Sequence, residues 1–152
     1  MYGVYDLANR LGDHGPKYVS GFIGPVVIKA FYEDEPEKFH EASPVDRVCS
    51  DAPPFLVVHG DRDTMSPLAD AELFVERLKE RSQAPVLFAR VGGAQHAFDV
   101  FLSPRSVPVV EGIGAFFDEV WRRHEAGSSL EERARTGGGD ARSRAHAGLR
   151  CS

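Results

Sequence analysis

An aspartate and a histidine of this sequence stand where a hydrolytic enzyme would place its acid and its base. Asp63 closely follows the apolar run 55–58, and His96 follows a second apolar segment further along the chain. Such a histidine takes the proton of a nucleophilic serine, and a buried carboxylate orients its ring and stabilises the imidazolium. Acid before base is the order of hydrolases whose triad runs Ser, Asp, His. The pair therefore predicts serine-type nucleophilic catalysis.

The serine itself is not evident. No G-x-S-x-G motif, which forms the strained turn that exposes a nucleophilic serine, occurs in the 152 residues. Triad members act as a unit, so that losing one removes most of the rate enhancement. We therefore expect a fragment that carries the acid and the base, with the nucleophile and the oxyanion hole supplied from elsewhere. The isolated chain is expected to be inactive or nearly so.

Other polar residues near the pair have simpler explanations. Asp61 is expected to be a surface turn residue after a strand, a common use of aspartate, and His59 to play a structural part at the end of that strand. A metal site formed by His59, Asp61, Asp63 and His96 is not expected, because the first three are too close in sequence to point at one ion together. No cofactor is expected either.

The regular elements that must position the pair lie from residue 55 onward. A continuous apolar run predicts a strand buried in a parallel sheet, and apolar residues at helical spacing predict the helices. In front of the helix over 70–81, Ser66 is the expected N-cap and Pro67 the expected first helical residue. The predicted elements are strands over 55–58 and 85–91 and helices over 70–81 and 106–123.

This alternation of strand and helix predicts a doubly wound α/β sheet. Chemistry in such sheets collects at the carboxyl ends of the strands. Asp63 lies just past the end of one predicted strand and His96 just past the end of the next. Both side chains are therefore expected at the same edge of the sheet.

The first part of the chain is less regular. Residues 1–5 favour the end of a strand, and residues 9–24, rich in glycine, favour an irregular loop or lid. Short helices are expected over 25–31 and 36–41. We expect residues 1–124 to form a partial domain and residues 125–152 a disordered tail, because the tail has too few large apolar residues to offset the cost of ordering it.

Composition excludes several classes of protein. The formal net charge of −5 gives no basic face for nucleic acid. No apolar segment reaches the roughly 20 residues that cross a bilayer, and the start lacks the layout of a signal peptide, so a cytoplasmic location is expected. The two cysteines, Cys49 and Cys151, imply neither a disulfide framework nor a metal cluster.

The motifs around the acid and the base resemble those of the α/β-hydrolases. Residues 59–67 match the pattern H-G-x-x-D-x-x-V-P except at Ser66, and residues 93–98 match G-x-x-H-x-F, with Ala97 where many members have glycine. Residues 42–44 resemble the family's A-S-P turn. The likeness covers roughly residues 1–123 and is nearest to the C-terminal portion of carboxylesterases and lipases related to hormone-sensitive lipase.

This resemblance implies ester hydrolysis through an acyl-enzyme, with Asp63 orienting His96 and a small-molecule ester as substrate. The sequence leaves other interpretations of the function open. The chain is alternatively a non-catalytic remnant that binds a partner through an open sheet edge, or a half-domain that complements a separately encoded partner. The open edge also favours self-association. Dienelactone hydrolases and peptidases of the prolyl oligopeptidase type share the same acid and histidine layout.

Overall fold

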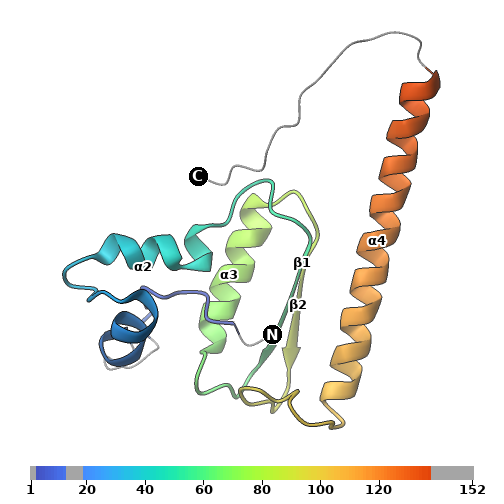
Figure 1. Cartoon of the computed structure of the whole chain (residues 1–152). Helices are drawn as coiled ribbons and strands as arrows, with labels where there is room; N and C mark the ends of the chain where they lie inside the picture. Colours follow the sequence, from blue (N-terminus) through green and yellow to red (C-terminus); the bar gives the residue numbers. More distant parts are fainter. Residues whose placement is uncertain (1–2, 13–18, 138–152) are drawn as a thin grey trace.

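The computed structural model describes residues 3–12 and 19–137. Its elements run from a helical N-terminal part into alternating strands and helices (Figure 1). They are the helical segments η1 (Val19–Ile28), α2 (Pro36–Ala42) and η2 (Pro44–Asp46), the strands β1 (Phe55–Gly60) and β2 (Val86–Val91), and the helices α3 (Leu68–Arg81) and α4 (Ser106–Gly137).

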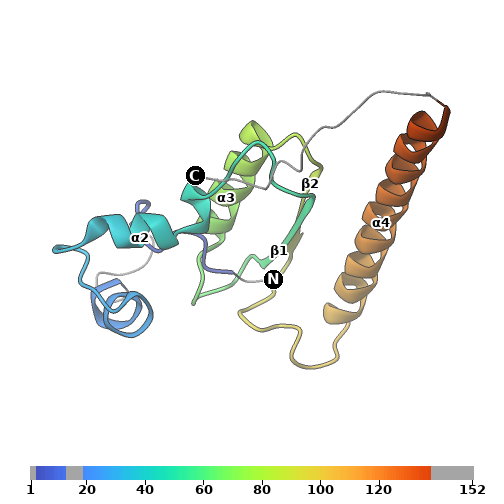
Figure 2. The same ribbon diagram turned by 45° about the horizontal axis from the view of Figure 1, so that its top comes forward.

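The two strands pair in parallel. Their register runs from Phe55 opposite Val86 to Gly60 opposite Val91. Helix α3 connects them and covers one face of the sheet, whereas α4 stands over the other face (Figure 1, Figure 2). A parallel pair joined through a helix is the repeating unit of α/β folds, so the predicted α/β class is confirmed. Both strands end at the same edge.

The main core lies between α3 and β1. Ala71, Phe74, Val75 and Leu78 of α3 are buried, and their three- and four-residue spacing places them on one face of the helix. They pack against Val57 of β1, Val45 of η2 and Val48 of the loop before β1. Burying one large apolar side chain is worth about 1.5–3 kcal/mol. This packing therefore fixes β1 and the residues that follow it.

Helix α3 starts differently from the prediction. Pro67 occupies the N-cap position and the helix begins at Leu68. The hydroxyl of Ser66, the expected N-cap, instead donates a hydrogen bond to the carbonyl of Gly3 at 2.7 Å. The N-cap prediction is wrong because this contact spans 63 residues of sequence, and a local pattern contains no signal for it.

Helix α4 is longer than expected. It passes the predicted end at residue 123 and continues to Gly137. Residues 125–137 continue this helix, and residues 138–152 of the expected tail lie outside the described residues. Ala126 and Leu130 are good helix formers, and no proline interrupts this stretch. Gly127 is a poor helix former, however, so local propensity alone does not explain the extension.

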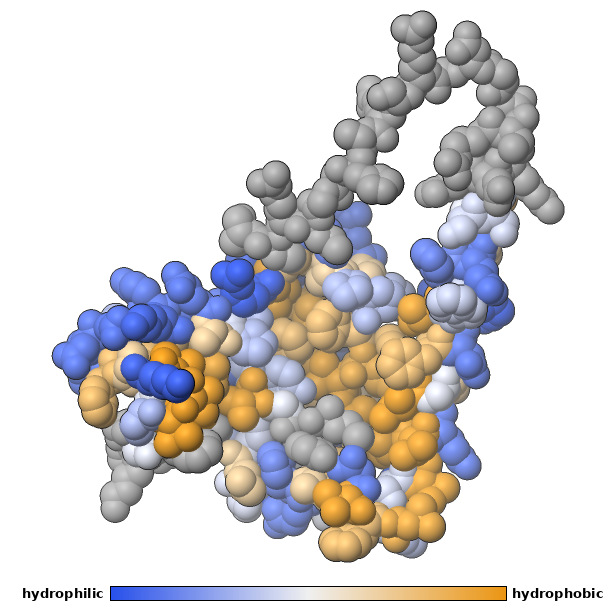
Figure 3. Space-filling view, viewed as in Figure 1, coloured by the Kyte–Doolittle hydropathy of each residue, from blue (hydrophilic) through white to orange (hydrophobic). Residues whose placement is uncertain are grey.

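The face between α4 and the sheet carries exposed apolar side chains. Leu87 of β2 is 52% exposed, and Phe117 and Trp121 of α4 are 64% and 63% exposed. Apolar residues gather over this part of the surface (Figure 3). In the described chain, α4 therefore covers its face of the sheet only in part.

Residues 3–6 do not form the end of a strand. The carbonyl of Tyr5 accepts a hydrogen bond from the amide of Val45 at 3.1 Å, and the amide of Leu7 donates to the Ser43 hydroxyl at 2.9 Å. The backbone of this segment therefore bonds to Ser43, between α2 and η2, and to η2 itself. The predicted strand is wrong because tertiary contacts override the β propensity of tyrosine and valine.

The next segments follow the expectation in part. The helix expected over 25–31 occurs earlier, as the π-type segment η1, with Pro25 inside it. Within the expected loop or lid over 9–24, residues 13–18 lie outside the described residues. The helix expected over 36–41 is confirmed as α2.

Cys49 lies half-buried in the loop before β1 and is disulfide-bonded. The expectation that the cysteines imply no disulfide is therefore wrong for Cys49, and Cys151 lies outside the described residues.

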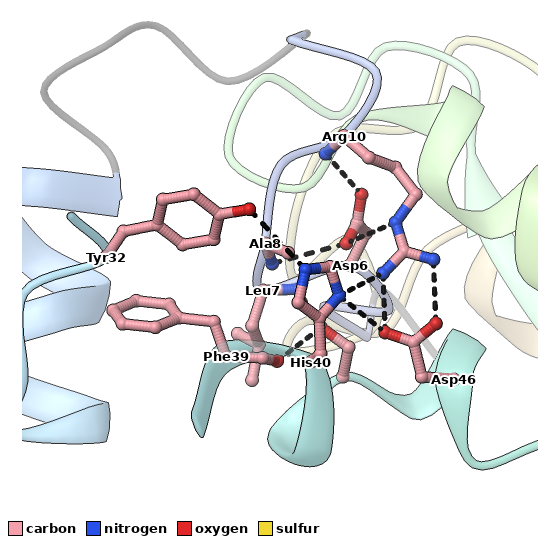
Figure 4. Close-up of polar contacts among 9 residues, drawn as sticks. Asp6, Leu7, Ala8, Arg10, Tyr32, Phe39, His40 and Asp46 are labelled. Atoms are coloured by element: carbon pink, nitrogen blue, oxygen red, sulfur yellow. Dashed lines mark hydrogen bonds and ion pairs between the residues drawn. The ribbon is translucent and has the colours of Figure 1, made fainter. Parts of the chain in front are cut away.

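A polar cluster ties the N-terminal loop to α2 and η2 (Figure 4). Arg10 donates through both terminal nitrogens to the carboxylate of Asp46, at 2.8 and 2.5 Å, and its Nε lies 3.3 Å from Asp6. His40 Nδ1 lies 3.1 Å from Asp46 Oδ2, and the Tyr32 hydroxyl lies 3.5 Å from His40 Nε2. The hydrogen bond from Arg10 lowers the pKa of Asp46, although burial opposes the shift.

The lowered pKa of Asp46 predicts a loss of stability in acid. A carboxylate whose pKa is lower in the folded state contributes stability above its ordinary pKa of 3.8. That contribution falls as the pH drops through the folded-state pKa. Urea unfolding from about pH 6 to about pH 3 should therefore show a smaller acid loss of stability for Asp46→Asn than for the wild-type chain. Equal losses in both proteins would contradict the assignment.

Candidate active site

The structure brings the predicted acid and base together. Asp63 follows β1 and His96 follows β2, so both lie at the carboxyl edge of the parallel pair. His96 Nδ1 lies 2.9 Å from Asp63 Oδ2 and 3.1 Å from Oδ1. Carboxylate oxygens accept, so Nδ1 carries the proton of this hydrogen bond. In the neutral ring, Nε2 then holds the lone pair that a general base uses.

The Asp63 carboxylate is held by its own turn. Its side chain is fully buried, whereas that of His96 is 27% exposed. Oδ1 accepts the backbone amides of Met65 and Ser66, at 2.9 and 2.8 Å. With Oδ1 engaged by two amides, Oδ2 is directed at His96. A buried acid paired with a partly exposed imidazole suits an acid that orients a base facing substrate.

The loops that carry the acid and the base are bonded to each other. Asp61 Oδ1 accepts the amide of Gly93 at 2.7 Å, and the amide of Arg62 donates to the carbonyl of Ala94 at 3.0 Å. A Cβ placed on Gly60 would lie 2.4 Å from that carbonyl oxygen. Only glycine therefore lets the two loops approach this closely.

Asp61 does more than serve as the surface turn residue that the sequence predicts. Its carboxylate links the acid loop to the base loop, and no sequence pattern signals that link. The backbone of Ala97, directly after His96, has a φ of +57°. This is the left-handed region that favours glycine, at the position where glycine is common among related motifs. The base loop is thus held by side-chain and backbone constraints together.

Removing the Asp61 carboxylate is expected to loosen the base loop. In Asp61→Ala, exchange of the Gly93 amide proton should accelerate roughly fivefold to tenfold, because its acceptor is lost. Asp61→Asn keeps an oxygen that can accept this hydrogen bond and should exchange nearly as slowly as the wild type. Hydrogen exchange followed by NMR measures both variants. Equal protection of Gly93 in the alanine variant would show that the carboxylate does not hold the loop.

His59 and Ser66 are buried and lie next to Asp63 of the Asp63–His96 pair. The His59 ring has no exposed surface, and its Nε2 lies 2.8 Å from the carbonyl oxygen of Ser66. The Ser66 hydroxyl is engaged with Gly3. These contacts agree with a structural part for His59 and leave the Ser66 hydroxyl bonded away from the Asp63–His96 pair.

Two further observations bear on the kind of site. Within the residues that the structure describes, no group of three or more His, Cys, Asp or Glu side chains is arranged to hold a metal ion. In the same part of the chain, no helix combines the length and the hydropathy that crossing a bilayer requires.

Comparisons with known proteins point to hydrolases. The model of the prolyl oligopeptidase family matches residues 25–122, which include both Asp63 and His96. Esterase LipC and Esterase LipQ of Mycobacterium tuberculosis are each 38% identical to this chain over 122 residues. Those residues make up 80% of this chain but only 30% and 28% of the two relatives. The probable carboxylic ester hydrolase LipM of the same organism is 35% identical over 128 residues, 84% of this chain and 30% of LipM.

A solved structure shares the fold. The truncated form of a carbohydrate esterase from gut microbiota superposes with a TM-score of 0.53 at 24% identity, covering 64% of this chain and 32% of that one. At this identity the likeness shows the fold alone. With the relatives above, it confirms the expected likeness to α/β-hydrolases of the carboxylesterase and lipase kind. The chain spans about 30% of the length of the curated esterases that it matches.

Proposed function

This chain belongs to the prolyl oligopeptidase family, and from that premise we propose that it carries the acid and the base of a serine-type hydrolase of carboxylic esters. The observation that supports this most is the hydrogen bond of 2.9 Å between His96 Nδ1 and the buried Asp63 carboxylate. It joins the ends of two adjacent parallel strands, the position at which α/β folds collect their chemistry.

The proposed reaction proceeds through an acyl-enzyme. His96 Nε2 takes the hydroxyl proton of a serine as the serine oxygen attacks the ester carbonyl. Asp63 stabilises the imidazolium, which then gives the proton to the departing alcohol. Water repeats the sequence on the acyl-enzyme, releases the acid and restores the serine. The serine and the oxyanion-hole donors come, in this proposal, from polypeptide outside these 152 residues, which contain no G-x-S-x-G.

Hydrolysis of p-nitrophenyl butyrate by the purified 152-residue chain tests the origin of the serine. Wild-type turnover should be no higher than that of Asp63→Ala and His96→Ala prepared identically. Turnover that disappears in both variants would contradict the proposal, because it would require a nucleophile within these residues or within their assembly.

Esters are the proposed small-molecule substrates because three relatives carry esterase or ester hydrolase names. Peptides are the second candidate, since the family model is named for an oligopeptidase. In an assembly that includes a serine, kcat/KM for p-nitrophenyl butyrate should exceed that for a prolyl p-nitroanilide. The reverse ranking would favour the peptidase.

Self-association is a further part of this proposal. In the described residues the sheet has two strands, β1 and β2, so each has an outer edge without a strand partner. Such edges are templates for pairing with another chain. Sedimentation at increasing concentration should show a dimer or larger species. A monomer throughout the range would contradict association through the edge.

A further inference from the structure

His59 is a buried histidine that the proposed reaction does not use. It lies in β1 with no exposed surface, and its Nε2 lies 2.8 Å from the Ser66 carbonyl oxygen. A carbonyl only accepts, so Nε2 must carry a proton. Nδ1 is also buried and has no hydrogen-bond partner among the described residues. A proton on Nδ1 would therefore be buried without an acceptor, which favours the neutral ring protonated at Nε2.

The residue that His59 holds through its carbonyl is also the one that binds the acid through its amide. The amide of Ser66 donates to Asp63 Oδ1 at 2.8 Å, and the Ser66 hydroxyl donates to the Gly3 carbonyl at 2.7 Å. The carbonyl of Ser66 accepts from His59. All three polar groups of Ser66 are thus engaged, and the residue forms a rigid link between His59 and Asp63.

The His59 ring also lies near the acid itself. Its Nε2 is 3.6 Å from Asp63 Oδ2, the oxygen that pairs with His96. This separation is too long for a hydrogen bond, but it places the partial positive charge of the Nε2–H group close to a buried carboxylate. A second contribution to the orientation of Oδ2 follows from this placement.

We propose that His59 is a positioning residue of the candidate active site. It donates from Nε2 to the Ser66 carbonyl, fixes the turn 63–66, and so directs Asp63 Oδ2 at His96 Nδ1. The consequence for catalysis rests on the proposed function, whereas the positioning itself does not. A residue that served only to fill the core would keep its role when replaced by an apolar ring of similar size.

NMR on the intact 152-residue chain separates the two roles. The probe is the imidazole Nδ1–H resonance of His96, which reports the hydrogen bond to Asp63. In His59→Phe the ring is retained but the donor is lost, so exchange of this proton should accelerate about tenfold, or the signal should disappear. In His59→Gln the side-chain amide can again donate to the Ser66 carbonyl and should restore slow exchange. An unchanged His96 signal in His59→Phe would overturn the proposal.

The wild-type chain supplies a second test that does not depend on the folding of a variant. Nitrogen-15 spectra of the imidazoles should show His59 protonated at Nε2 and not at Nδ1. Protonation at Nδ1 would overturn the proposal, since Nε2 could then not donate to Ser66. Neither spectrum involves turnover. Ester hydrolysis that is independent of His96 would contradict the proposed function and leave this positioning intact.

Discussion

The Asp63→Asn substitution is expected to lower ester hydrolysis by about four orders of magnitude in an enzyme that contains the serine. The hydrogen bonds within the turn 63–66 decide the orientation of the asparagine side-chain amide. The amides of Met65 and Ser66 both donate to Oδ1, so the amide oxygen must occupy that site. The NH2 group is then left facing His96 Nδ1, where it can only donate. This forces the imidazole proton onto Nε2, and the ring can no longer accept the proton of the serine.

A chimera makes this prediction measurable. In it, the 122 residues of Esterase LipC that align with this chain are replaced by those of this chain. The value of kcat/KM for p-nitrophenyl butyrate is compared among the chimera, its Asp63→Asn variant and its His40→Ala variant. His40 is the matched control, because its Nδ1 also lies 3.1 Å from an aspartate, Asp46, but away from the site. Similar losses for His40→Ala and Asp63→Asn would indicate that stability, not catalysis, is affected.

The Gly60→Ala substitution is expected to destabilise the chain by about 1–3 kcal/mol and to disturb the active-site loops. The added Cβ would lie 2.4 Å from the carbonyl oxygen of Ala94 and 2.8 Å from its carbonyl carbon. Both atoms are backbone, so the clash cannot be relieved by turning a side chain. The loop that carries His96 would have to move away from the loop that carries Asp63.

Gly112→Ala is the control for that substitution. A Cβ at Gly112, within α4, would meet no atom within 4 Å, and alanine is a better helix former than glycine by about 1 kcal/mol. Urea unfolding should therefore show a lower midpoint for Gly60→Ala and an equal or higher one for Gly112→Ala. A Gly60→Ala protein with the wild-type midpoint and an unchanged His96 imidazole spectrum would contradict the close approach of the two loops.

The elements that the sequence predicts correctly are those with strong local patterns. The apolar run 55–58 indicates β1, and the repeat of buried residues over 70–81 indicates α3. Because parallel strands end at one edge, the positions of Asp63 and His96 after two such strands were enough to predict their meeting. Their catalytic roles are still predictions.

The features that the sequence does not predict depend mostly on contacts between distant segments. The link from Asp61 to Gly93 spans 32 residues, and the hydrogen bond from Ser66 to Gly3 spans 63. Neither residue type signals such a partner. The hydrogen bond from His59 to Ser66 is close in sequence but depends on how the turn after β1 folds back. A pattern of residue types therefore gives the elements and the pair, but not the network that orients the pair.

The most direct test of the central claim is the turnover of p-nitrophenyl butyrate by the LipC chimera with and without His96. We expect the chimera to hydrolyse the ester and His96→Ala to lower kcat/KM by about four orders of magnitude or more. A His96→Ala chimera as active as the unsubstituted one would contradict the claim that this chain carries the base of the hydrolase.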